Sequence, residues 1–181
     1  PTRKLLLYIG RLAQEKNVET LFGAFERLRG RGDFHLLVVG DGAQRGLVSR
    51  LQETGDDVTW QSYCDNSLEL ARLYRAADIF VHPGVQETFG FVALESQACG
   101  TPVAGISGSY MDRIIFHDQS SWARENSPEA LAEAIARLAA SDLRALGASA
   151  AKEAAERHAW PRVFERLFCI YREVCSNYRR T

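Results

Sequence analysis

The sequence lacks several features that would each assign it to a particular class of protein. No apolar run approaches the length of a membrane span and no signal peptide opens the chain, so neither a membrane-spanning nor a secreted protein is expected. The 22 basic and 23 acidic residues give a net charge of −1. Such a balance argues against broad nucleic-acid binding, which usually needs a basic excess, but it leaves room for a local basic site aimed at a phosphate.

Cysteine is also scarce, and its four copies form no recognisable pattern. No two are spaced as CxxC, and Cys169 and Cys175 share one expected helix without being at contact spacing. We therefore expect free thiols and a reducing, cytoplasmic location. No HExxH motif, Cys/His cluster or DxD pair occurs, so neither a metal nor another cofactor is expected.

What the 181 residues do contain is an ordinary globular composition, 46% hydrophobic, in which strands alternate with helices. Strands are expected at 5–9, 35–39, 58–60, 79–82 and 102–106, with a further short strand within 114–116. Helices are expected at 18–29, 46–53, 68–77, 89–99, 128–140, 142–158 and 160–177. Because the strands are continuous apolar runs, we predict one doubly wound, Rossmann-like α/β domain whose parallel sheet is covered on both faces.

Ligands of such folds bind beyond the carboxyl ends of the strands, so the loops there are the informative ones. The loop after the first strand carries Arg11 and Lys16, a planar fork and a mobile point charge that together could neutralise a diphosphate. An ordinary solvated surface loop explains two such cations equally well. The turn Gly40-Asp41-Gly42 could let a ligand approach closely, although two glycines more commonly just make a turn.

The most informative segment is PGVQETFGFVALESQACG, residues 83–100. Its apolar residues predict a buried helix beginning near Phe89, on which Glu95 is the single charge. A lone buried carboxylate is costly unless it is paired or faces a polar ligand, so Glu95 could accept from ribose hydroxyls or from a core arginine. The backbone N–H groups at the helix start could meet an anion, with Glu87 placed just outside to reach a sugar.

Motifs of other enzyme classes are missing. The glycines after the first strand do not form GxGxxG, which disfavours a dinucleotide-dependent oxidoreductase. Ser107-Gly108-Ser109 lacks the glycine that would complete a nucleophile elbow. His82 ends a buried strand beside Pro83, and we interpret it as a core histidine with satisfied hydrogen bonds.

Together these segments resemble the C-terminal, donor-binding domain of retaining GT-B glycosyltransferases of the family-four type (glycosyl transferases group 1). The resemblance covers nearly the whole chain and rests on GRLAQEKN at 10–17, VVGDG at 38–42, YRAADIFVHPGVQETFGFVALESQACGTPV at 74–103 and HAWPRVFERLFCIYREV at 158–174. Its most specific element is the pair Glu87 and Glu95 with seven residues between them.

The resemblance implies roles for individual residues. Arg11 and Lys16 would bind the donor diphosphate, Glu87 would contact the donor sugar, and these three form the implied catalytic set. Glu95 would hold the ribose. The region near Tyr63 and Cys64 would face the base, and the backbone N–H groups around Phe89 to Phe91 would meet sugar or phosphate. The full implied donor-binding set is Arg11, Lys16, Cys64, Glu87, Phe89, Gly90, Phe91 and Glu95.

The resemblance also implies a reaction: transfer of a hexose from a UDP- or GDP-sugar to an acceptor hydroxyl, with retention and without a metal. Residues 1–181 would then be a single nucleotide-sugar-binding domain, inactive without an N-terminal acceptor domain. The helix at 160–177 could pack on that domain, while packing on the core of this one is the alternative. The full-length enzyme would be cytoplasmic, and peripheral association with the cytoplasmic face of a membrane is compatible with this expectation.

Three stretches depart from the family pattern. Gly108-Ser109-Tyr110-Met111-Asp112 stands where Gly-Gly and then Glu are frequent, 117–121 replaces a glycine-rich turn, and Gly84 replaces a frequent serine. These departures bear on donor specificity and loop geometry. The alternative functions are a GT-B nucleotide-sugar epimerase, a sugar phosphorylase, or a non-catalytic nucleotide- or sugar-binding module.

Overall fold

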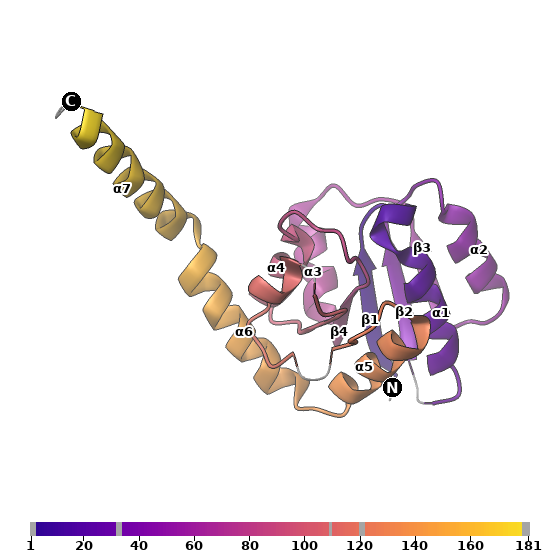
Figure 1. Ribbon diagram of the computed structural model, residues 1–181. Coiled ribbons are helices and arrows are strands. Elements are labelled where there is room, and N and C mark those ends of the chain that lie inside the picture. The colour runs from indigo at the N-terminus through magenta and orange to yellow at the C-terminus, as the bar shows by residue number, and fades with distance from the viewer. Residues whose placement is uncertain (1–2, 32–33, 109, 120–121, 179–181) are drawn as a thin grey trace.

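A computed structural model of the chain describes residues 3–31, 34–108, 110–119 and 122–178. It contains a five-stranded parallel sheet in the order β3-β2-β1-β4-β5 (Figure 1). The strands are β1 (Lys4–Ile9), β2 (Phe34–Val39), β3 (Val58–Gln61), β4 (Ile79–His82) and β5 (Val103–Gly105). The predicted parallel sheet is confirmed, and its strands lie within one or two residues of the expected positions.

Helices cover both faces of the sheet, as the continuous apolar strands predict. The helices are α1 (Val18–Leu28), α2 (Arg45–Glu53), α3 (Ser67–Ala76), α4 (Phe91–Ala98), α5 (Pro128–Ala139), α6 (Leu143–His158) and α7 (Trp160–Tyr178). Successive strand residues point to opposite faces, so Leu6 packs with α1, α2 and α5 whereas Leu7 packs with α3 and α4. Two separate apolar cores therefore sandwich the sheet.

The predicted strand within 114–116 is wrong. Ile114 and Ile115 are buried, as their apolar character suggests, but the segment follows a short 3₁₀ helix (Tyr110–Arg113) and pairs with none of the described strands. The amide of Gln97 on α4 satisfies this backbone instead. Its Nε2 donates to the Ile114 carbonyl at 2.8 Å, and its Oε1 accepts from the Phe116 N–H at 2.9 Å.

The last two helices leave the body of the domain (Figure 1). Helix α6 lies close against α4, since a Cβ on Gly147 would overlap the backbone of Gly100. Helix α7 then extends outward, and none of its described residues is buried. The interpretation that this helix packs on the core of this domain is therefore wrong. No helix in the described part of the chain is long and apolar enough to cross a membrane.

Candidate functional site

The candidate site lies where the order of the strands reverses. The chain runs from β1 outward through β2 and β3, then returns to place β4 against the other side of β1. At such a junction two loops diverge beyond the carboxyl ends of adjacent strands, and α/β proteins bind ligands there. The loop after β1 carries Arg11 and Lys16, and the loop after β4 carries Glu87, so three of the predicted residues flank one point of the sheet.

The centre of this site is an ion pair between the two loops. Lys16 Nζ lies 2.5 Å from Glu87 Oε1, although the residues are 71 positions apart in the sequence. The Lys16 side chain is 29% exposed and that of Glu87 is 10% exposed, so the pair borders solvent without being fully solvated. The structure thus brings together two residues that the sequence could only place on separate loops.

A third group, the His82 imidazole, completes this cluster. Its Nε2 lies 3.5 Å from the same Glu87 oxygen. The contact with His82, followed by that with Lys16, holds the pKa of the Glu87 carboxyl at about 2, although burial opposes the shift. Glu87 is therefore a carboxylate throughout the neutral range. It can accept hydrogen bonds from a ligand but has no proton to donate.

The interpretation of His82 as a core histidine with satisfied hydrogen bonds is only half right. The residue is 5% exposed, yet its Nδ1 has no hydrogen-bond partner among the described residues. Gly84 gives the ring its space, because a Cβ there would lie 3.0 Å from His82 Cε1. The departure from serine at position 84 therefore has a local physical reason.

Arg11 is held differently from Lys16. Its side chain is 66% exposed, and its guanidinium lies 3.2 Å from Glu15 within the same loop. Surface pairs of this kind contribute about 0–1 kcal/mol, so an incoming anion can displace Glu15 at little cost. The backbone beneath Arg11 is fixed, because the Tyr8 hydroxyl donates to the Arg11 carbonyl at 2.9 Å. Burial, together with the nearby carboxylates, raises the pKa of Tyr8, which keeps it a donor.

Two further contacts hold the loops in register. Asn17 adopts a left-handed conformation, with φ 56°, between a short 3₁₀ turn and α1. Its Nδ2 donates to the Pro83 carbonyl at 2.8 Å, which ties the loop after β1 to the loop after β4. Gly40 lets the loop after β2 lie directly against the loop after β1, because a Cβ there would overlap the Gly10 carbonyl oxygen. The close approach at this glycine is therefore to another loop of the protein.

The expected environment of Glu95 is wrong. Helix α4 is not buried all round: Glu95 lies on its exposed side, and Phe91 is 65% exposed. The error arises because an apolar helix composition cannot distinguish burial from an open apolar face. The alternative of a core arginine is also not what is observed, since Tyr74 donates its hydroxyl to Glu95 Oε2 at 3.0 Å. Glu95 is an exposed residue, so its carboxylate remains accessible from solvent.

Helix α4 begins at Phe91, two residues later than predicted, because Gly90 has φ 84° and breaks the helical path. The N-cap residue is Gly90, which has no side chain, so the first-turn N–H groups receive no side-chain cap from that position. Met111, in the stretch 108–112 that departs from the family pattern, packs against Gly90. A Cβ on Gly90 would clash with the Met111 sulfur. Phe89 contacts Phe91, with ring centroids 4.7 Å apart.

The remaining predicted positions lie at the edge of the site or outside the described residues. Cys64 is half-buried in the loop after β3, and its Sγ lies 3.7 Å from the Asn66 carbonyl. Neighbouring Tyr63 is 73% exposed. Ser109 and the pair 120–121 fall outside the described residues. An open, largely polar depression of about 500 Å³ adjoins the two central loops and is lined by residues that include Gln14, Asn17, Gln86 and Asn126.

Sequence reasoning missed three contributors: His82 as a partner of Glu87, Tyr74 as a partner of Glu95, and Asn17 as the tie between loops. A signal existed for each. His82 lies at the carboxyl end of an expected strand, and Tyr74 lies in the expected helix at 68–77 with a hydroxyl that needs a partner if it is buried. Asn17 is a residue type that tolerates left-handed backbone between helical segments. Among the described residues, no three His, Cys, Asp or Glu side chains are grouped as a metal site.

Comparison with known proteins identifies the family. The family model described as glycosyl transferases group 1 matches residues 3–141, and the chain belongs to that family. A GDP-mannose-dependent alpha-(1-6)-phosphatidylinositol dimannoside mannosyltransferase from Mycobacterium tuberculosis is 37% identical over 136 residues. That match covers 75% of this chain and 35% of the relative, so the chain spans about a third of the relative's length.

Solved structures agree with this assignment. Sucrose-phosphate synthase from Thermosynechococcus elongatus superposes with a TM-score of 0.81 and 29% identity, covering 96% of this chain and 46% of that one. The C-terminal domain of the glycosyl transferase group 1 family protein LpcC from Francisella tularensis has the same fold, with a TM-score of 0.69 and 21% identity. In that case the match covers 86% of this chain and 85% of the other. The GT-B type of fold predicted from the sequence is confirmed.

Proposed function

We propose that this chain is the donor-binding domain of a retaining hexosyltransferase, and that it binds a GDP- or UDP-linked sugar without a metal. GDP-mannose is the first donor to test, because the Mycobacterium tuberculosis relative is GDP-mannose-dependent by name. The observation that carries the proposal is the contact of Lys16 with Glu87 at the β1–β4 junction. This contact supports the proposal, because a cation suited to phosphate lies beside a carboxylate suited to sugar hydroxyls.

The assigned roles follow from charge. As the bond from the sugar to the diphosphate breaks, negative charge accumulates on the leaving group, and fixed cations stabilise it. Lys16 can exchange its contact with Glu87 for phosphate oxygens, and Arg11 can exchange Glu15 in the same way. Glu87, ionised because its pKa is about 2, accepts from donor-sugar hydroxyls. The exposed Glu95 carboxylate accepts from ribose, and the N–H groups at the start of α4 face sugar or phosphate.

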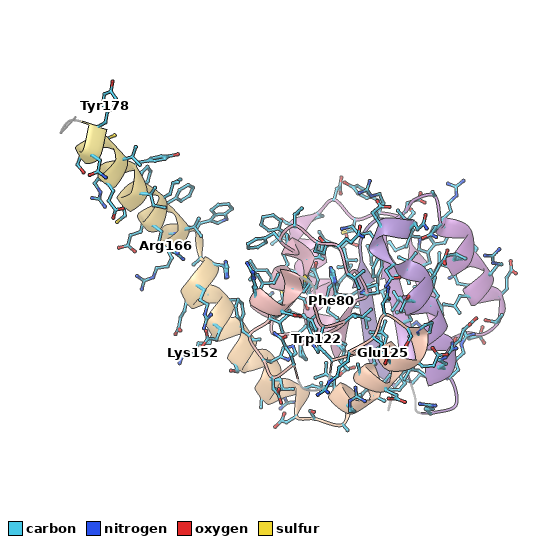
Figure 2. The ribbon with its side chains drawn as sticks, in the orientation of Figure 1. Phe80, Trp122, Glu125, Lys152, Arg166 and Tyr178 are labelled. Atoms are coloured by element: carbon cyan, nitrogen blue, oxygen red, sulfur yellow. The ribbon has the colours of Figure 1, made fainter. Side chains whose placement is uncertain are left out.

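The proposal includes a second, acceptor-binding domain that contacts α7. In Figure 2, α7 extends away from the body of the domain. Arg166 and Tyr178, both labelled on this helix, lie far from the sheet. The rings of Trp160, Phe164 and Phe168 follow one another at 5.5 and 6.3 Å along one side of this helix. An apolar stripe of this kind requires a partner surface, and the partial coverage of the relatives supports an N-terminal domain as that partner.

Calorimetric titration of the chain with GDP, UDP, GDP-mannose and UDP-glucose, with and without EDTA, tests the donor site. Charge-assisted contacts contribute about 1.5–3 kcal/mol each, so Arg11→Ala, Lys16→Ala and Glu95→Gln should each weaken binding by about tenfold or more. Lys152→Ala is the control, because this exposed lysine lies on α6 (Figure 2). Unchanged affinity in both cation variants, or a strict need for Mg²⁺, would contradict the proposal.

Activity gives a separate test. Positioning two reactants can lower a barrier by about 7–11 kcal/mol, and a donor domain alone cannot place the acceptor hydroxyl. Residues 1–181 should therefore bind a radiolabelled donor yet transfer its sugar to no member of an acceptor panel. Joining the chain to an N-terminal acceptor domain of the family should restore transfer with retention. Robust transfer by residues 1–181 alone would refute the need for a second domain.

A further inference from the structure

The packing of His82 alone does not explain why a histidine occupies this position. The residue ends β4, is 5% exposed, and its nearest ring neighbour, Phe80, lies at a centroid distance of 6.5 Å. Its Nδ1 is unpaired among the described residues, and a buried polar atom without a partner lowers stability. An apolar side chain would fill the same space without that cost. The described polar contact of the imidazole is the one from Nε2 to Glu87.

The chain next to His82 is shaped around this contact. A Cβ on Gly84 would lie 3.0 Å from His82 Cε1 and 3.5 Å from Glu87 Oε1. A Cβ at this position would press on the ring and would contact the carboxylate, so glycine lets both groups keep their positions. The end of β4 and the loop that follows it therefore have a geometry that suits a fixed imidazole–carboxylate arrangement.

Glu87 has two neighbours that differ in mobility. Lys16 Nζ and His82 Nε2 both approach the same oxygen, Oε1, at 2.5 and 3.5 Å. Lys16 has a flexible four-carbon side chain, and in the proposed function it binds the donor diphosphate, so its contact with Glu87 would weaken when a donor binds. His82 is buried at the end of β4, so its imidazole cannot move to contact the phosphate.

We propose that His82 is a positioning residue that keeps the Glu87 carboxylate aimed at the donor sugar after Lys16 has turned to the diphosphate. This inference rests on the proposed function, since it concerns the same donor site. To donate to Glu87 the imidazole carries a proton on Nε2, and in the neutral ring Nδ1 is then an acceptor. His82 touches no ligand itself. Its effect is on the sugar contact and not on the diphosphate contact.

The ratio of the GDP dissociation constant to the GDP-mannose dissociation constant isolates this effect, with UDP and UDP-glucose as a second pair. His82→Leu removes this contact, and the ratio should fall by about threefold, the low end of the range for a net hydrogen bond, because Nε2 lies 3.5 Å from Glu87 Oε1. His82→Gln returns a donor at a similar reach and should recover most of the ratio. Should His82→Leu fail to fold, His82→Asn replaces it, because its shorter amide retains polarity but does not reach Glu87.

A measurement on the ligand-free chain provides an independent readout. Carboxyl-carbon NMR should show the Glu87 pKa rising from about 2 in His82→Leu and rising less in His82→Gln. A ratio and a Glu87 pKa that stay the same in His82→Leu would overturn the role of His82 while leaving the proposed function intact. Absence of any nucleotide binding by the unaltered chain would overturn the proposed function and this inference with it.

Discussion

Replacement of Glu87 by glutamine should make the stability of the domain less dependent on pH. The folded-state pKa of about 2 lies below the ordinary value of 4.5, so ionised Glu87 stabilises the folded state. A depressed pKa contributes stability that is complete above pH 4.5 and is lost as the pH falls toward 2. Glu87→Gln abolishes this contribution and leaves Lys16 without its counter-charge.

The size of the effect follows from the same pKa. Without solvent screening, the difference from 4.5 corresponds to about 3 kcal/mol at neutral pH. The Lys16 side chain is 29% exposed, so water weakens the attraction, and we expect about 1–2 kcal/mol. About half of the difference in the free energy of unfolding between the unaltered chain and Glu87→Gln should disappear by pH 3.

Urea denaturation of both proteins at several pH values between 7 and 3 measures the difference directly. Other carboxylates titrate equally in the two proteins, so their contributions cancel in the difference. Glu156→Gln is the matched control, since this exposed residue pairs with Lys152 at 4.0 Å on the surface of α6 and should show no such trend. A Glu87→Gln difference that stays constant from pH 7 to pH 3, or grows on acidification, would refute the reasoning.

Two other substitutions test the framework of the site. Gly40→Ala should lower the free energy of unfolding by about 2–3 kcal/mol, because its Cβ would overlap the Gly10 carbonyl oxygen at φ 144°. Gly46→Ala, in open space within α2, should instead stabilise by about 0.5–1 kcal/mol in the same denaturation assay, and equal effects would contradict the argument. Tyr74→Phe should lower the free energy of unfolding by about 1 kcal/mol, because the hydrogen bond to Glu95 is lost. In calorimetry it should weaken nucleotide binding less than Glu95→Gln does, because the carboxylate persists. A larger loss of affinity would show that Tyr74 itself contacts the ligand.

The sheet could be predicted from the sequence because burial on both faces leaves a strong local signal. Each strand is a short apolar run followed by glycine, proline or polar residues, and helices of matching length fill the intervals. Arg11, Lys16 and Glu87 could be placed at strand ends for the same reason. The contact between Lys16 and Glu87 could not be predicted from periodicity, because it depends on which strands become neighbours.

The errors have a common physical origin. Apolar composition shows that a segment must meet another surface, but not whether that surface belongs to the same domain. It led to the expectation of a buried α4, although Phe91 and Glu95 lie on exposed positions, and to the core-packing interpretation of the helix at 160–177. The strand wrongly expected at 114–116 has the same origin, because its apolar residues are indeed buried. Its backbone, however, is hydrogen-bonded by the Gln97 side chain and not by a neighbouring strand.

The exposed apolar residues bear on the position of the proposed second domain. Of the eleven large apolar side chains exposed in the described part of the chain, eight are on α7, which places the main unpartnered surface on one helix. His158, at the end of α6, packs edge-on against Phe89 at a centroid distance of 5.9 Å and stacks on Phe116 at 5.6 Å. Phe89 belongs to the loop of Glu87. If the proposed second domain orients α7, it would act next to His158, which already contacts the loop after β4, and the two proposed domains would be mechanically connected through this residue.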